Sequence, residues 1–311
     1  MAGVPAGYTI EEFDFEHLPE SDVDALLALS NRVGAEREHR HRPLTREDLL
    51  VFVNMPGEVQ KRFMIRDNSG VPVAQMSAGH ADDGSNPHLL RVRLMVDADH
   101  RRCGLATALI AEAVAIAESQ NRDSLTGIVF DTMEAGGAFL AAIGGERQVE
   151  HQQNLLSLKD LDTDLLHGWV DDGPSRAPGY SVQLVEGAYP EEILDQMAHL
   201  YFVLERDMPA PEGQDPRQRT GAEVAEFIAH FLRGGEILTA IAFGDETGEA
   251  TGMSQLFRRH SDHETWLVTT TMVDPAHRGH ALGKWVKAAV NLEALEKWPG
   301  GRYEETGNAE G

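Results

Sequence analysis

The pattern of hydrophobic and polar positions predicts strands and helices that occur in the same order twice. In the first half, an alternating segment at 8–17 precedes two amphipathic helices, one with Ser21 and one with Thr45 as the expected capping residue. Three strand-like runs, a long helix, a strand, a short helix and another strand follow at 61–67, 71–80, 89–96, 103–120, 124–131, 134–144 and 146–158.

A polar segment at 171–179 ends this series, and the order then restarts. Turn-forming residues without an apolar period are typical of a linker. The next elements are expected at 180–189, 190–206, 220–235, 236–245, 249–259, 264–273, 282–298 and 302–306. A length of 311 residues suits two domains. We therefore expect an N-terminal domain at 1–160, a linker at 161–179 and a C-terminal domain at 180–311.

The two halves also share sequence at one junction between a strand and a long helix. An offset of 177 residues aligns 95–109 with 272–286. Six of these fifteen positions are identical pairs: Met95/Met272, Val96/Val273, Asp97/Asp274, His100/His277, Arg101/Arg278 and Leu105/Leu282. Such identity at equivalent points of two similar element orders indicates an internal duplication.

The charge balance limits the partners of this chain. With 27 basic and 51 acidic residues its formal net charge is −24, and both halves are acidic. We therefore expect no nucleic acid and no anionic membrane surface as partner, because both need clustered Lys and Arg. The surplus carboxylates suit either a cationic partner or simple solubility. The single cysteine, Cys103, excludes an intramolecular disulfide. Without a long apolar segment or a basic, apolar leader, the chain is expected to be cytoplasmic.

The repeated junction is a candidate site for an anion. Each copy places a basic loop rich in small residues, at 101–106 and 278–283, directly before a helix. The first N–H groups of a helix lack intrahelical partners and lie at its positive end, which suits a pyrophosphate. The loops are neither a Walker loop nor a GxGxxG loop. A plain strand-to-helix turn is the alternative interpretation.

Arg101-x-x-Gly104-x-Ala106 resembles the acetyl-CoA signature of the GNAT superfamily of N-acetyltransferases, [Q/R]-x-x-G-x-[G/A]. Arg278-x-x-Ala281-x-Gly283 departs from it at one position, where Ala281 replaces the usual glycine. The resemblance implies an α+β (mixed α/β) fold of two tandem GNAT-like domains, each a mostly antiparallel twisted sheet flanked by helices. The layout is similar to that of tandem two-domain members such as mycothiol synthase, although nothing in the sequence assigns that substrate.

The resemblance also implies the residues around acetyl-CoA, the acyl donor. Loop amides bind its pyrophosphate, and strand backbone holds its pantetheine arm. The implied residues are Met95, Val96, Arg101, Arg102, Cys103, Gly104, Leu105, Ala106 and Thr107 in the first repeat, and Met272, Val273, Arg278, Gly279, His280, Ala281, Leu282, Gly283, Lys284 and Asn308 in the second. A primary amine of a small, cationic acceptor then attacks the thioester directly in a ternary complex.

The second repeat is the better candidate for the chemistry. In this family the base usually lies on the strand before the signature, and 88–94 contains no carboxylate. The second repeat offers Glu264, with His263 beside it, and Glu305 on the following strand as catalytic candidates. Glu264 as a solvated strand end is the competing interpretation. The second domain is expected to stop before its last helix and strands.

Other features carry weaker expectations. The histidines His39 and His41 lack a convincing ligand spacing, so no metal is expected. Carboxylates in the loop 207–219, namely Asp207, Glu212 and Asp215, either attract a cationic amine or belong to a solvated loop. The alternatives to a small-molecule N-acetyltransferase are a catalytically silent acyl-CoA-binding or assembly module and a protein-amine acetyltransferase.

Overall fold

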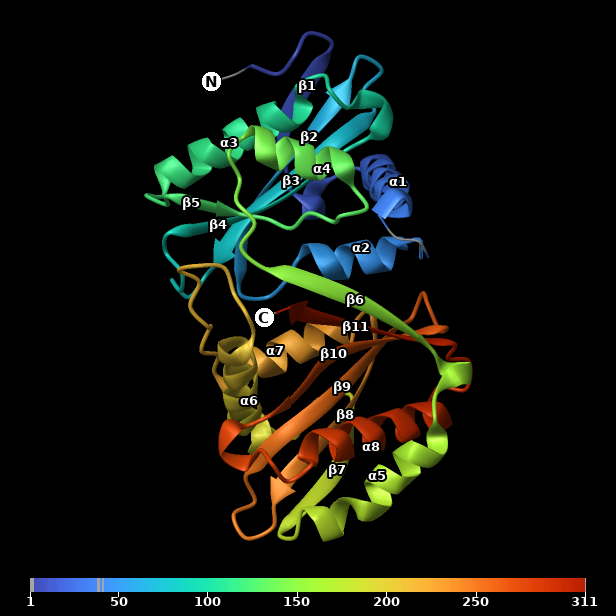
Figure 1. Cartoon of the computed structure of the whole chain (residues 1–311). Coiled ribbons are helices and arrows are strands. Elements are labelled where there is room, and N and C mark those ends of the chain that lie inside the picture. The colour runs from blue at the N-terminus through green and yellow to red at the C-terminus, as the bar shows by residue number, and fades with distance from the viewer. Residues whose placement is uncertain (1–2, 38–39, 41, 311) are drawn as a thin grey trace. The chain divides into compact units, whose positions relative to one another are not determined.

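The computed structural model describes residues 3–37, 40 and 42–310, and it divides into two units, residues 1–147 and 148–311 (Figure 1). Each unit has its own mostly antiparallel sheet and its own buried apolar clusters. Among the described residues, none of the helices combines the length and apolar character needed to cross a bilayer.

The first unit is a five-stranded sheet in the order β1-β2-β3-β4-β5, in which only β4 and β5 are parallel. Its strands are β1 (Tyr8–Phe13), β2 (Glu58–Asp67), β3 (Pro72–Ala81), β4 (Leu89–Val96) and β5 (Ser124–Thr126). Its helices are α1 (Glu20–Arg37), α2 (Arg46–Val53), α3 (Leu105–Ser119) and α4 (Glu134–Ala142). Helices α1 and α2 contribute to the cluster around Met64, and α3 packs on the opposite face against Phe63 and Ile65.

The second unit is a six-stranded sheet in the order β6-β11-β10-β9-β8-β7, in which only β10 and β11 are parallel. Its strands are β6 (Glu150–Ser157), β7 (Tyr180–Glu186), β8 (Gly235–Gly244), β9 (Ala250–Arg259), β10 (Thr265–Val273) and β11 (Tyr303–Glu310). Its helices are α5 (Thr163–Arg176), α6 (Leu194–Asp207), α7 (Gly221–Phe231) and α8 (Leu282–Lys297). Helices α6 and α7 cover the face of Met253, and α8 covers the face of Leu256.

Capping boxes begin two helices, and the one at Thr45 was predicted. Thr45 and Asp48 form a capping box on α2, and Thr220 and Glu223 form the same arrangement on α7. By contrast, α1 begins at Glu20, so Ser21 lies inside its first turn.

The structure differs from the sequence prediction around the expected domain boundary. Most of the expected linker at 161–179 is helix α5, because Gly173 packs against α8 instead of forming a turn: a Cβ built there would lie 2.4 Å from the Trp285 ring. Strand β6, which the sequence suggested as the end of the first repeat, pairs with β11 over its whole length. The second sheet therefore includes β6, a strand that precedes α5 and that the sequence placed in the first domain.

Candidate functional site

The two repeated junctions have the same local framework. After β4 and β10 come short 3-10 turns at Ala98–His100 and Pro275–His277, and then the helices α3 and α8. Asp97 accepts a hydrogen bond from the amide of Asp99 at 3.3 Å, and Asp274 accepts one from the amide of Ala276 at 2.9 Å. Partial burial raises the pKa of each aspartate, but hydrogen bonds outweigh it, so the net pKa of both is lowered.

The signature arginines connect each loop to the preceding strand and to a helix of the same unit. Arg101 Nε donates to the Val96 carbonyl at 3.2 Å, and its two terminal nitrogens lie 2.7 and 3.0 Å from the carboxylate of Glu36 at the end of α1. Arg278 Nε likewise donates to the Val273 carbonyl at 3.0 Å, and Arg278 forms an ion pair with Asp207 at the end of α6. Each arginine therefore links its loop to the preceding strand and to a helix. Asp207 is the helix partner of Arg278 in the second unit.

A tyrosine at the start of an edge strand, β1 in the first unit and β7 in the second, adds a second brace. Tyr8 Oη lies 3.1 Å from His100 Nδ1, and Tyr180 Oη lies 2.9 Å from His277 Nδ1. In both pairs the ring centroids are 5.8 Å apart in an edge-on arrangement. The two histidines lie within the repeated segment, whereas the tyrosines lie far from it and could not be found from the repeat.

The loops reach the same left-handed backbone with different residues. In the first loop Arg102 and Gly104 have φ of 63° and 84°; in the second, Gly279 and Ala281 have φ of 87° and 57°. Ala281, which departs from the signature, thus adopts the backbone that Gly104 has in the other repeat. A non-glycine residue in this region is strained, so each loop contains one strained position.

The amides of both loops are available to a ligand. Within the part of the chain that the structure describes, the N–H groups of residues 102–107 and 279–283 have no hydrogen-bond acceptor. They lie at the positive end of a helix, where backbone N–H groups bind phosphate. The exposed Cys103 thiol lies 3.5 Å from the Arg101 carbonyl and also interacts with the Tyr8 hydroxyl; burial and then this thiol raise the pKa of Tyr8.

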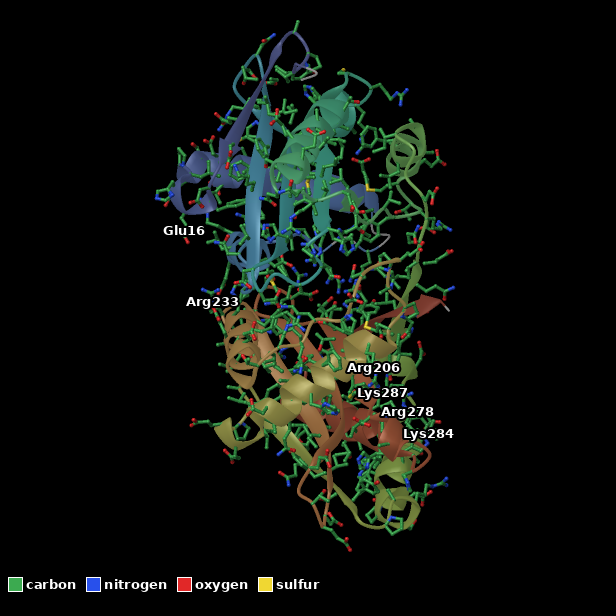
Figure 2. The ribbon with its side chains drawn as sticks, turned by 90° about the vertical axis from the view of Figure 1, so that its left-hand side faces the viewer. Glu16, Arg206, Arg233, Arg278, Lys284 and Lys287 are labelled. Carbon is green, nitrogen blue, oxygen red and sulfur yellow. The ribbon has the colours of Figure 1, made fainter. Side chains whose placement is uncertain are left out.

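Basic side chains surround the second loop. Figure 2 labels Arg206 at the end of α6, Arg278 in the loop, and Lys284 and Lys287 on the first two turns of α8. Hydrogen bonds from Arg206, joined by Arg278, lower the pKa of Asp207 and keep it ionised between the two guanidinium groups. This second loop therefore combines free amides with nearby basic residues, of which Arg206 and Arg278 form ion pairs with Asp207 and Lys287 with Glu304.

Strand pairing is interrupted twice at Thr269. The ladder between β10 and β11 ends at the pair Val268–Thr306, and the ladder between β10 and β9 shifts register between Val268 and Thr270. Thr269 is thus the extra residue of a β-bulge at the point where the parallel neighbour also departs. Beyond Thr269, β10 continues to Val273 and the loop. Over this stretch it pairs with β9 on one edge, and the edge toward β11 has no strand partner in the described part of the chain.

The first unit has only one of these interruptions. Pairing between β4 and β5 ends at Arg91–Thr126, but the ladder between β3 and β4 runs without a bulge from Arg91 to Val96. Counted as ladder pairs with β3 and β9, which omits the bulged Thr269, the pair Arg91–Thr126 corresponds to Leu267–Glu305 in the second unit. The first unit therefore has threonine where the second has a carboxylate.

The catalytic candidates lie at different distances from the loop. Glu264 precedes β10 and binds Arg302 at 3.1 Å; nine residues of strand, about 30 Å, separate it from Val273. Glu305 lies opposite Leu267, one pair before β10 and β11 diverge, and Asn308 lies beyond the divergence, opposite Gln152 of β6. The divergence therefore brings Glu305, and not Glu264, to the bulge.

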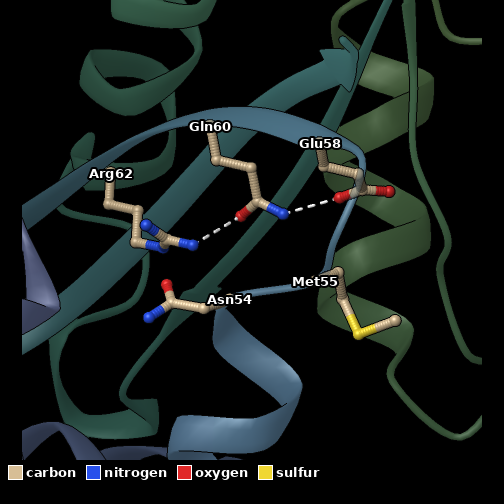
Figure 3. A pocket seen from close by; sticks show the side chains of 5 residues that line it. All are labelled: Asn54, Met55, Glu58, Gln60 and Arg62. Atoms are coloured by element: carbon tan, nitrogen blue, oxygen red, sulfur yellow. Dashed lines mark hydrogen bonds between the residues drawn. The ribbon is translucent and has the colours of Figure 1, made fainter. Parts of the chain in front are cut away.

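A separate cavity of about 200 Å³ lies in the first unit (Figure 3). It is lined by Asn54, Met55, Glu58, Gln60 and Arg62, with Gln60 bridging Arg62 and Glu58 at 2.9 and 2.6 Å. These residues lie at the start of β2, at the end of the sheet opposite the loop. No cluster of metal-binding side chains occurs among the described residues, and His39 and His41 lie outside them.

Comparisons with known proteins assign the fold. Residues 26–136 match the acetyltransferase (GNAT) family. A tandem GNAT protein from the clavulanic acid biosynthesis pathway is similar over 97% of this chain and 90% of its own, with a TM-score of 0.78 and 24% identity. A GCN5-related N-acetyltransferase from Sphaerobacter thermophilus is similar over 99% of this chain and 88% of its own, with a TM-score of 0.66 and 12% identity. N-myristoyltransferase from Saccharomyces cerevisiae, with bound myristoyl-CoA, is similar over 97% of this chain and 76% of its own, with a TM-score of 0.56 and 12% identity. Comparison with curated proteins finds no match.

Proposed function

Because residues 26–136 belong to the acetyltransferase (GNAT) family and the whole chain has the fold of a tandem GNAT protein, we propose that it is an N-acetyltransferase. It transfers an acetyl group from acetyl-CoA to a primary amine of a small molecule. The amine attacks the thioester carbon directly in a ternary complex, the C–S bond breaks, and the thiol leaves. The second unit performs this reaction, and the first unit either binds CoA or has become a structural partner.

Both loops fit the pyrophosphate of CoA. Free amides on a left-handed turn at the start of a long helix suit a polyanion without any dedicated basic residue. The second loop adds Arg206, Arg278 and Lys284, which favour negative charge further.

The observation that carries the assignment to the second unit is the double interruption at Thr269. An acyl group lying along β10 meets a strand edge there that β11 no longer pairs, so backbone N–H groups on that edge can face it. Fixed donors of this kind stabilise the negative charge that develops on a carbonyl oxygen during acyl transfer. The unbroken ladder of β4 gives the first unit no such point.

Glu305 is our candidate for the base that removes a proton from the attacking ammonium. This choice rests on the position of Glu305 beside the divergence of β10 and β11. Glu264 instead binds Arg302 at the start of β10. A carboxylate there also favours a cationic acceptor, in keeping with the net charge of −24.

The test is the release of thiol from acetyl-CoA in the presence of a panel of polyamines, amino sugars, aminoglycosides and amino acids. We expect amine-dependent release by the full chain, a loss of at least about 100-fold in kcat/KM for Glu305→Gln, and no more than about a threefold change for the matched control Glu264→Gln.

Absence of release with every amine contradicts the proposal. Binding of acetyl-CoA by calorimetry without turnover would instead indicate a silent acyl-CoA-binding module. Transfer to peptides alone would indicate a protein-amine acetyltransferase.

A further inference from the structure

A buried network of side chains lies directly behind the bulge of β10. At its centre is Gln255 of β9, which is 4% exposed. Its Nε2 donates to Tyr189 Oη at 2.6 Å and to Thr239 Oγ1 at 3.1 Å, and its Oε1 accepts from Thr269 Oγ1 at 2.8 Å. Tyr201 Oη completes the group, 3.2 Å from Tyr189 Oη. All polar ends of the Gln255 amide are therefore used.

The hydrogen bonds of this network satisfy the buried polar groups of its members. Burial raises the pKa of Tyr189 and of Tyr201, so both phenols stay neutral donors at ordinary pH. Breaking a bond inside such a group leaves a buried polar atom without a partner, which is costly.

Thr269 is the member that reaches the proposed site. Its side chain is exposed, it is the extra residue of the bulge, and its hydroxyl is tied to the buried amide of Gln255. A bulged residue lacks the ladder bonds that fix an ordinary strand residue. The Thr269–Gln255 bond substitutes for them on the side where an acyl group is expected.

We propose that Gln255 is a positioning residue, which fixes the backbone at Thr269 through the hydroxyl of that threonine and so aligns the amides that face the reacting acyl group. This inference rests on the proposed acyl transfer in the second unit. The first unit lacks the device: the position equivalent to Gln255 is Ser77, and Arg93 lies opposite it in a strand without a bulge.

The test compares Thr269→Val, which keeps the shape and removes the hydroxyl, with Thr269→Ser, which keeps the hydroxyl. We expect Thr269→Val to lower kcat about tenfold, with KM for acetyl-CoA unchanged within about twofold, and Thr269→Ser to recover the rate to within about threefold. Gln255→Met should lower kcat similarly, and the double variant should lose no more than Gln255→Met alone. Ser77→Ala in the first unit is the matched control and should leave kcat unchanged.

The outcomes separate this inference from the proposed function. Active wild-type protein with an unaffected Thr269→Val variant overturns the positioning role alone, as does an equal loss in Thr269→Val and Thr269→Ser. A change confined to KM also overturns it. Wild-type protein that binds acetyl-CoA but acetylates no amine overturns both.

Discussion

Replacing Ala281 by glycine should stabilise the second unit, although the change introduces glycine beside a long helix. Ala281 has φ of 57° and an exposed side chain, so its methyl group is strained and buries little surface. The left-handed conformation costs a residue with a Cβ about 1–2 kcal/mol. Glycine returns about 0.4–1 kcal/mol of this through the entropy of the unfolded chain. The net gain is about 0.5–1 kcal/mol, or roughly 2 °C in Tm.

Tryptophan fluorescence measures this change in the second unit alone. All four tryptophans, Trp169, Trp266, Trp285 and Trp298, lie after residue 147. The matched control is Ala289→Gly inside α8, which should lower the free energy of unfolding by about 1 kcal/mol.

The reciprocal change, Gly104→Ala, should destabilise the first unit. Gly104 has φ of 84°, and a Cβ there lies 3.3 Å from Pro5 Cγ. The unfolding transition of the first unit, followed by circular dichroism, should shift to lower temperature. The transition followed by tryptophan fluorescence should stay unchanged. If Ala281→Gly lowers Tm as much as Ala289→Gly does, the argument from backbone strain is refuted.

Three further predictions concern stability. Thr220→Ala removes the side-chain cap of α7 and should cost about 1 kcal/mol by fluorescence-monitored urea unfolding; an unchanged midpoint contradicts a role for the cap. Gly301→Ala places a methyl group 2.3 Å from the buried Trp266 ring and should cost about 1–3 kcal/mol with altered emission, so an unaltered spectrum and Tm speak against this packing. Because Arg206 lowers the pKa of Asp207 in the folded state, the stability it adds is present at neutral pH and lost as pH falls below about 4. The Tm of Asp207→Asn should therefore fall less than that of wild type between pH 5 and 3, and parallel curves contradict this.

Local sequence was sufficient to predict most elements and the two strand-to-helix junctions that hold the candidate loops. Hydrophobic period located the long helices, and the caps at Thr45 and Thr220 act between residues three apart. The repeated Arg101 and Arg278 marked the junctions because the duplication preserved their neighbours. Their bonds to Glu36 and Asp207 depend on packing and were not evident in the sequence.

Long-range choices could not be predicted in this way. Gly173 indicates a turn when only its neighbours are considered, but the Trp285 ring needs the space that its missing side chain leaves. The bulge at Thr269 lies within a run of three threonines that carries no signal for it. Sequence distance to the signature favoured Glu264, whereas strand register brings Glu305 to the divergence.

The central claim is that the loop of the second unit serves the chemistry, and a matched pair of substitutions tests it directly. Ala106 and Gly283 occupy the same position in the first turns of α3 and α8. Aspartate there suits a helix start, so folding should persist, but its charge repels a pyrophosphate. The measurement is kcat/KM for acetyl-CoA in the thiol-release assay. We expect a loss of at least about tenfold for Gly283→Asp and near wild-type activity for Ala106→Asp. Loss in Ala106→Asp alone, or equal loss in both, contradicts the account.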